Sequence, residues 1–247
     1  MRIAVVGKGG SGKTTTASVV ARTLARRGEP VIALDGDTNA NLGISLGLGL
    51  EATEGLVTMR EQLDAGEQEH ADDVEVLLER FGCAAPDGVR LAVVTRIESP
   101  EPGCPCCGLS IEQVLTQLEA TGSTVVADLE AGLGTLSRLR DRGGIDLALV
   151  VVEPTPKSLE VGVRAARLAR DNGVARVVVV ANRIRTDADT ALVREAFDGE
   201  QVVAVPDDPA IVAADREGTA PLDAHPQAPA VRALEELAGQ LGLAAAR

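Results

Sequence analysis

The sequence predicts an α/β protein with a doubly wound, mostly parallel sheet that is flanked by helices on both sides. Short β-branched runs alternate with longer Ala-, Leu- and Arg-rich stretches, as expected for strands that alternate with helices. The short runs are apolar throughout, which suits strands that are covered on both faces. A glycine-rich turn, Gly7–Gly12, lies between the first run and the first helical stretch.

Seven runs are expected to form the sheet, and five amphipathic stretches are expected to cover it. In chain order, the strands are Ile3–Val6, Val31–Leu34, Leu91–Val94, Thr124–Ala127, Leu147–Val152, Val177–Ala181 and Val202–Val205. The helices are Thr14–Arg27, Ile111–Thr121, Leu159–Asn172, Ala188–Ala196 and Ala230–Leu241. Gly28 and Pro30 mark the end of the first helix before the second strand.

The 247 residues read as a single domain, because no Gly/Ser-rich linker divides the chain. Two stretches interrupt the alternation of strands and helices. Glu51–Asp87 is polar and is expected to be a helical insertion. Glu98–Gly108 carries three prolines and three cysteines and is expected to be a loop.

Composition limits the partners. There are 24 Lys and Arg against 37 Asp and Glu, a formal net charge of −13, which disfavours nucleic acid and stable membrane association. The chain has no Trp or Tyr for stacking bases, and its two histidines exclude a three-histidine metal site. No segment approaches about 18 apolar residues, and a strand begins within two residues of Met1, so we expect a cytoplasmic protein.

The strongest motif is Gly7–Thr14, which fits G-x-x-x-x-G-K-[ST] between a strand and a helix. Such glycines let backbone N–H groups surround phosphate oxygens, Lys13 is placed to reach the β- and γ-phosphates, and the Thr14 hydroxyl is placed to ligate Mg²⁺. The same glycines fit the dinucleotide pattern G-x-G-x-x-G, with Asp35 as the ribose-binding acid. Lys13 and Thr14 favour the triphosphate reading, because a dinucleotide site needs neither a cation nor a Mg²⁺ ligand there.

With its early lysine, Lys8–Thr14 resembles the deviant P-loop of the family that contains the nitrogenase iron protein, the Min and plasmid-partition ATPases and metal-centre assembly ATPases. The resemblance implies an ATP-sandwiched homodimer in which Lys8 contacts the partner's nucleotide. It implies that ATP and Mg²⁺ bind here. The implied nucleotide-binding residues of this segment are Gly9, Gly10, Ser11, Gly12, Lys13, Thr14 and Thr15.

Later segments match the family in order. Asp37, after the second strand, corresponds to the carboxylate that orients or deprotonates the attacking water. Asp128 ends a buried strand, as in a Walker B motif, and would hold the Mg²⁺ shell. The resemblance assigns base contacts to Asn182, Arg183, Pro206 and Asp207. Residues 128–132 are similar to the second switch of the accessory ATPases that insert nickel into carbon monoxide dehydrogenase, although Gly134 and Thr135 replace the Glu-His pair usual there.

The segment Cys104-Pro105-Cys106-Cys107 points to a soft or borderline cation such as Ni²⁺ or Zn²⁺. One Cys-x-Cys offers only two ligands, and a two-fold axis would complete four-coordination. The nickel-insertion ATPases carry a Cys-x-Cys at this place, which makes Cys104 and Cys106 the best-matched ligands and Cys107 an addition or substitute. Loop cysteines without a ligand, or a thiol–disulfide pair, remain alternatives. An iron–sulfur cluster is disfavoured, because residues 128–140 hold no cysteine, and Cys83 is expected to be a packed thiol.

The leading hypothesis is a dimeric ATPase that helps insert metal into a client metalloenzyme. The alternative is a metal-independent positioning or partition ATPase that acts on a protein scaffold, membrane or DNA. A carboxylate-activating synthetase is a third reading, but the chain shows no extension for a substrate domain.

Overall fold

The computed structural model describes residues 1–37, 40–56, 82–93, 118–129 and 144–245, together with Leu78 and Leu115. The described strands form one sheet in the order β3-β4-β2-β5-β1-β6-β7-β8. Every neighbouring pair is parallel except β3 and β4. The strands are β1 Arg2–Gly7, β2 Val31–Gly36, β3 Cys83–Ala84, β4 Arg90–Val93, β5 Thr124–Leu129, β6 Leu147–Val152, β7 Arg176–Ile184 and β8 Gln201–Pro206. The predicted fold class is confirmed.

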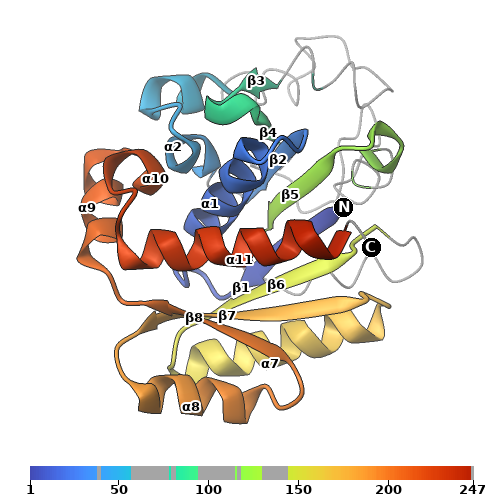
Figure 1. Ribbon diagram of the computed structural model, residues 1–247, viewed down its shortest axis with the longest axis vertical. Coiled ribbons are helices and arrows are strands. Elements are labelled where there is room, and N and C mark those ends of the chain that lie inside the picture. The colour runs from blue at the N-terminus through green and yellow to red at the C-terminus, as the bar shows by residue number, and fades with distance from the viewer. Residues whose placement is uncertain are drawn as a thin grey trace.

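Helices cover both faces of the sheet (Figure 1). Those on one face are α1 Lys13–Arg26, α2 Leu42–Leu46, α10 Pro221–Ala224 and α11 Pro229–Ala245. Those on the other are α7 Pro156–Asp171 and α8 Asp187–Ala196. Helix α9 Pro209–Glu217 and the 3-10 turns η1 Pro86–Gly88 and η2 Leu118–Thr121 complete the named helical elements. Residues 50–56 are also helical.

Two apolar cores lie on opposite sides of the sheet, because alternate residues of its strands point to opposite faces. In β1, Ile3 and Val5 join the core beneath α1 and α11, whereas Ala4 and Val6 join the core beneath α7. Strands β1, β2, β5 and β6 are apolar on both faces for this reason.

All seven expected strands are present, with ends that differ by at most three residues where the structure describes them. The end of the predicted helical insertion Glu51–Asp87 is different: Cys83–Ala84 forms β3, and η1 follows. Pro86-Asp87-Gly88 is a turn-forming sequence, which explains why a helix does not continue there. Most of the expected helix Ile111–Thr121 lies outside the described residues, and its last four residues form η2.

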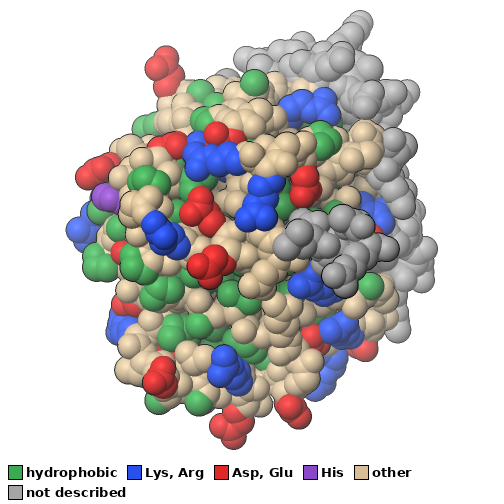
Figure 2. Space-filling view, in the orientation of Figure 1, with side chains coloured by type: hydrophobic (Ala, Val, Ile, Leu, Met, Phe, Trp, Pro, Cys, Tyr) green, Lys and Arg blue, Asp and Glu red, His purple; other side chains and the backbone are tan. Residues whose placement is uncertain are grey.

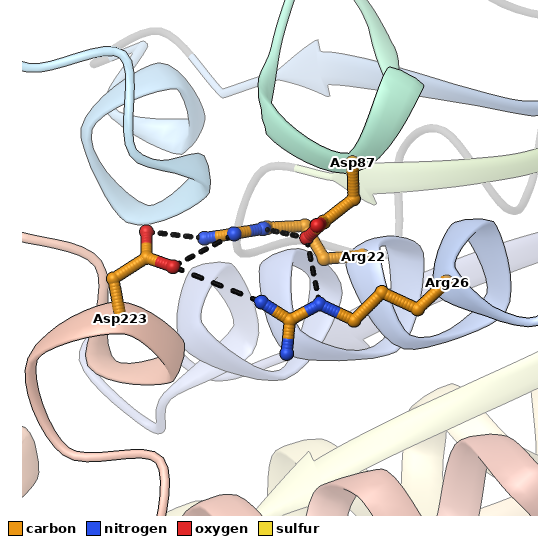
Figure 3. Close-up of polar contacts among 4 residues, drawn as sticks. All are labelled: Arg22, Arg26, Asp87 and Asp223. Atoms are coloured by element: carbon orange, nitrogen blue, oxygen red, sulfur yellow. Dashed lines mark hydrogen bonds and ion pairs between the residues drawn. The ribbon is translucent and has the colours of Figure 1, made fainter.

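A polar cluster links α1 to two elements that lie far away in sequence (Figure 3). Arg22 and Arg26 of α1 both donate to Asp87 in η1, and Arg22 also donates to both carboxylate oxygens of Asp223 in α10. The Arg22 side chain is only 3% exposed. The helix that follows the glycine-rich turn is therefore held to the β3–β4 edge of the sheet and to the C-terminal region.

Candidate functional site

The glycine-rich turn joins the carboxyl end of β1 to the first residue of α1. Gly12 caps α1 with φ 100°, a left-handed conformation that favours glycine. A Cβ on Gly12 would lie 2.2 Å from Asn182 Nδ2, so a side chain there would displace the Asn182 amide. The Asn182 amide donates to the Ser11 carbonyl at 2.7 Å and holds the turn against β7.

The start of α1 is suited to an anion. No side chain caps its first turn, and that turn carries no acidic residue. The Ser11 hydroxyl is buried and has no hydrogen-bond partner among the described residues. Free N–H groups, the positive end of the helix dipole and an orphaned hydroxyl form the kind of cradle that phosphate groups occupy.

Lys13, Thr14 and Asp128 meet beside this turn. Lys13 is 6% exposed, and the Thr14 side chain lies near enough to the Asp128 carboxylate, at the end of β5, to lower the pKa of that carboxyl. Burial raises the pKa of Asp128 to about 6, although Thr14 and Lys13 oppose the shift. Asp128 Oδ1 is buried and has no hydrogen-bond partner in the described part of the chain. A hydroxyl and a carboxylate with an unused oxygen are ligands that Mg²⁺ prefers, so these residues fit the ion.

Asp35 and Asp37 occupy the end of β2. Asp35 pairs in register with Asp128 on the neighbouring strand β5. Its carboxylate accepts from Asp37 N at 3.2 Å and from Leu42 N at 2.8 Å, and so holds both ends of the segment between them. Burial raises the pKa of Asp35 to about 7, aided by the nearby Asp128 charge and opposed by the Leu42 hydrogen bond.

A pocket lies next to the glycine-rich turn and brings together residues that the sequence predicted separately. Its walls come from the start of α1, the ends of β7 and β8, and the first turns of α9 and α11. The lining residues are Gly12, Thr15, Thr16, Asn182, Arg183, Val205, Pro206, Asp207, Asp208, Ile211, Val212, Ala230 and Leu234. All four residues expected to contact the base are therefore found in one pocket.

A β-bulge places Asn182 and Arg183 at this pocket. The pairing of β7 with β8 shifts register between Ala181 and Ile184. Arg183 lies at φ 56°, which is uncommon for a residue with a side chain. Its guanidinium pairs with Glu153, and Arg185 pairs with Asp207 at 2.7 Å. Such bulges occur often beside active sites, where they redirect side chains.

Lys8 comes directly after Gly7 in the turn and is only half-buried. Among the described residues, its Nζ donates to the Gly9 carbonyl of the same turn, at a long distance of 3.4 Å. Its ammonium group is thus not drawn into the cluster around Lys13 and Asp128. Gly9 and Gly10 beside it are exposed.

The cysteine segment with Cys104, Cys106 and Cys107 lies outside the described residues, as do Gly134 and Thr135. Cys83 is described: it is half-buried against the core, and burial raises the pKa of its thiol. Within the described part of the chain, no three His, Cys, Asp or Glu residues are grouped to hold a metal ion.

Two residues that are not among the predicted residues of the triphosphate site are prominent here. Asp35 organises the segment that follows β2, and Asp208 caps α9 through Ala210 N at 3.0 Å. The Asp208-Pro209 pair is a helix-start signal that could have shown the cap, since proline is favoured directly after the N-cap. No sequence pattern reveals the two hydrogen bonds of Asp35.

A family model described as "CobQ/CobB/MinD/ParA nucleotide binding domain" matches residues 3–222. The chain belongs to this family. It is 30% identical over 244 residues to the carbon monoxide dehydrogenase accessory protein CooC of Rhodospirillum rubrum, covering 92% of this chain and 91% of CooC.

Solved structures of the family share the fold. The septum site-determining protein MinD of Pyrococcus horikoshii OT3, complexed with Mg-ADP, superposes with a TM-score of 0.71 at 21% identity and covers 97% of this chain and 95% of its own. The cell division ATPase MinD of Pyrococcus furiosus gives 0.72 at 22% identity and covers 98% of both chains.

Membership of the CobQ/CobB/MinD/ParA family indicates the general reaction, which is ATP hydrolysis. This protein is a P-loop ATPase, and ATP with Mg²⁺ is the expected ligand of the cradle described above. Within the described residues, no helix has both the length and the apolar character needed to cross a membrane.

Proposed function

We propose that this ATPase works as an ATP-dependent homodimer that helps insert a metal ion, nickel in the first instance, into a metalloenzyme such as carbon monoxide dehydrogenase. The observation that carries the proposal is the 30% identity to CooC over nearly the whole of both chains. The Cys104-Pro105-Cys106-Cys107 segment supports it independently, because clustered thiolates suit a soft or borderline metal ion.

In this proposal the α1 cradle binds the triphosphate. The N–H groups between Gly9 and Thr15 and the Ser11 hydroxyl contact phosphate oxygens, and Lys13 neutralises their charge. Thr14 and Asp128 hold Mg²⁺, which would supply positive charge beside the β- and γ-phosphates. The buried oxygens of Ser11 and Asp128, which have no partner among the residues that the structure describes, support these assignments.

Hydrolysis would be assisted from the end of β2. Asp37 is half-buried next to the cradle, and its backbone is tied to the Asp35 carboxylate. Asp37 would orient or deprotonate the water that attacks the γ-phosphate. The phosphoryl group then passes to the water oxygen while the bond to the ADP oxygen breaks.

Dimerisation would join this chemistry to metal handling. Lys8, whose ammonium group stays outside the Lys13 cluster, would reach the nucleotide of a partner subunit. Cys104 and Cys106 of the two subunits would then supply four thiolates to one cargo ion, with Cys107 an additional or substitute ligand. Loss of the γ-phosphate would loosen the dimer and release the metal to its client.

The experiment compares metal content in paired cysteine variants. Native mass spectrometry with Mg-ATP and Ni²⁺ should show one nickel ion per dimer in the unmodified protein and no nickel in Cys104→Ser/Cys106→Ser. Cys83→Ser is the matched control, because this half-buried thiol lies outside the motif and should leave metal content unchanged. Equal metal content in the double variant and the unmodified protein would contradict the metal half of the proposal.

A positioning or partition ATPase remains the alternative, and the fold likeness to MinD is compatible with it. Charge does not favour DNA: the chain carries −13, and Figure 2 shows Lys and Arg interspersed with Asp and Glu on the described part of the face that α11 crosses. Co-sedimentation with DNA or liposomes in the presence of ATP, without bound metal, would favour the alternative.

A further inference from the structure

One carboxylate joins the starts of two helices that lie far apart in sequence. Asp208 Oδ1 accepts from Ala210 N in the first turn of α9 at 3.0 Å. Its Oδ2 accepts from Ala230 N in the first turn of α11 at 3.1 Å. A negative charge between two helix N-termini also interacts favourably with both helix dipoles. A single side chain therefore bridges these two helix ends.

These helix starts are walls of the pocket beside the glycine-rich turn. Ile211 and Val212 of α9 follow directly after the N–H group that Oδ1 accepts from. Ala230 of α11 carries the second N–H group, and Leu234 lies one turn further on. The Asp208 carboxylate thus connects these mainly apolar walls.

The pocket and the phosphate cradle present different chemical groups to a ligand. Its floor includes Gly12 and Thr15, where the cradle begins, whereas the α9 and α11 walls offer the aliphatic side chains of Ile211, Val212 and Leu234. Aliphatic walls suit the flat face of a nucleobase and offer nothing to phosphate. A change in wall separation should therefore affect the base and leave the phosphates unaffected.

We propose that Asp208 is a positioning residue for the nucleotide base. It holds α9 and α11 at the spacing at which their side chains contact the base. The proposal rests on the assignment of this pocket to the base of ATP. Asp208 then contributes to affinity for nucleotides that carry a base and not to affinity for a bare triphosphate.

The test is Asp208→Asn, which keeps one acceptor oxygen but replaces the other with an NH₂ group that cannot accept a hydrogen bond. We expect KM for ATP to rise about tenfold while kcat stays within about twofold, as follows when binding energy is lost equally in ground and transition states. The Kd of inorganic tripolyphosphate, measured on the same sample, should stay within about twofold. That measurement shows that the cradle is still folded.

Thr186→Ala is the matched control. Thr186 caps α8 by accepting from Asp189 N at 3.2 Å, and it does not line the pocket. Its loss should lower the melting temperature as any lost cap does and leave KM for ATP unchanged. The proposal is overturned if Asp208→Asn leaves KM for ATP unchanged, or if it lowers the affinity for tripolyphosphate as much as the affinity for ATP. It is also overturned if the unmodified protein binds ATP no better than tripolyphosphate. None of these outcomes depends on metal content, so they are separable from failure of the metal proposal.

Discussion

Replacing Arg22 with methionine should destabilise the fold more than any single exposed ion pair would. The Arg22 guanidinium donates to Asp87 at 2.7 Å and to the two oxygens of Asp223 at 2.6 and 2.8 Å. It is 3% exposed, so almost all of its hydration is replaced by these contacts. Methionine keeps most of the apolar stem and removes the charge, which isolates the polar part of the interaction.

The expected loss of unfolding free energy in Arg22→Met follows from the burial of the ion pairs. Removing one partner of a fully buried ion pair costs about 3–5 kcal/mol, because it leaves an uncompensated charge. Here the two carboxylates are 22% and 48% exposed, and Arg26 remains beside them. Water and Arg26 therefore compensate part of the loss, and we expect Arg22→Met to lower the free energy of unfolding by about 2–3 kcal/mol.

Equilibrium urea unfolding at pH 7 measures this change, provided that the m-value is unaltered. Arg26→Met is the matched control on the same helix: Arg26 is 39% exposed and donates to Asp87 at 2.9 Å. Its loss should cost about 1 kcal/mol or less, as for other exposed pairs. A loss for Arg22→Met no larger than that for Arg26→Met would refute the argument that burial strengthens this cluster.

Three further predictions concern the cradle, its carboxylates and the packing of α7. Gly12→Ala should abolish ATP binding in a calorimetric titration, because its Cβ would meet Asn182 Nδ2 at 2.2 Å and φ is 100°; affinity equal to that of the unmodified protein would contradict the cradle. Asp35 has a pKa of about 7 in the folded state against about 4 in an unfolded chain, so the folded protein holds a proton that unfolding releases. Without nucleotide, the free energy of unfolding should therefore fall as pH rises from about 4 to 7, and Asp35→Asn should remove much of that slope when urea unfolding is repeated across the range. Gly162→Ala should destabilise by about 1–3 kcal/mol through overpacking, since its Cβ would lie 2.3 Å from Val152 Cγ1 and 2.9 Å from Phe197 Cζ. Gly55→Ala, in a helix with open space around the added Cβ, should be neutral or stabilising by up to about 1 kcal/mol; similar melting curves for the two alanine variants would show that α7 is less tightly packed than described.

The sheet was predictable because its central strands are buried on both faces and therefore appear as unbroken apolar runs. Short elements were harder to predict from the sequence. β3 has two residues and pairs antiparallel at the sheet edge, and no periodic pattern extends over so few positions. Helix α2 has five residues, and its start depends on the Asp35 carboxylate at Leu42 N rather than on a local cap.

The candidate site likewise has one part that the sequence predicts and one part that depends on the folded chain. Residues 7–14 are a local motif, and their conformation follows from glycine spacing and the helix that they begin. The pocket beside the glycine-rich turn is assembled from four separate parts of the chain, and the position of Asn182 depends on a bulge between β7 and β8. The double cap of Asp208 joins residues 22 positions apart, which only the folded chain brings together.

The mass of the protein in solution with saturating Mg-ATP and Ni²⁺ tests the central claim most directly. Light scattering coupled to metal analysis should show a dimer with one nickel ion per two chains, and a monomer once the nucleotide is removed. A monomer in the presence of both ligands, or a dimer without bound metal, would contradict the account.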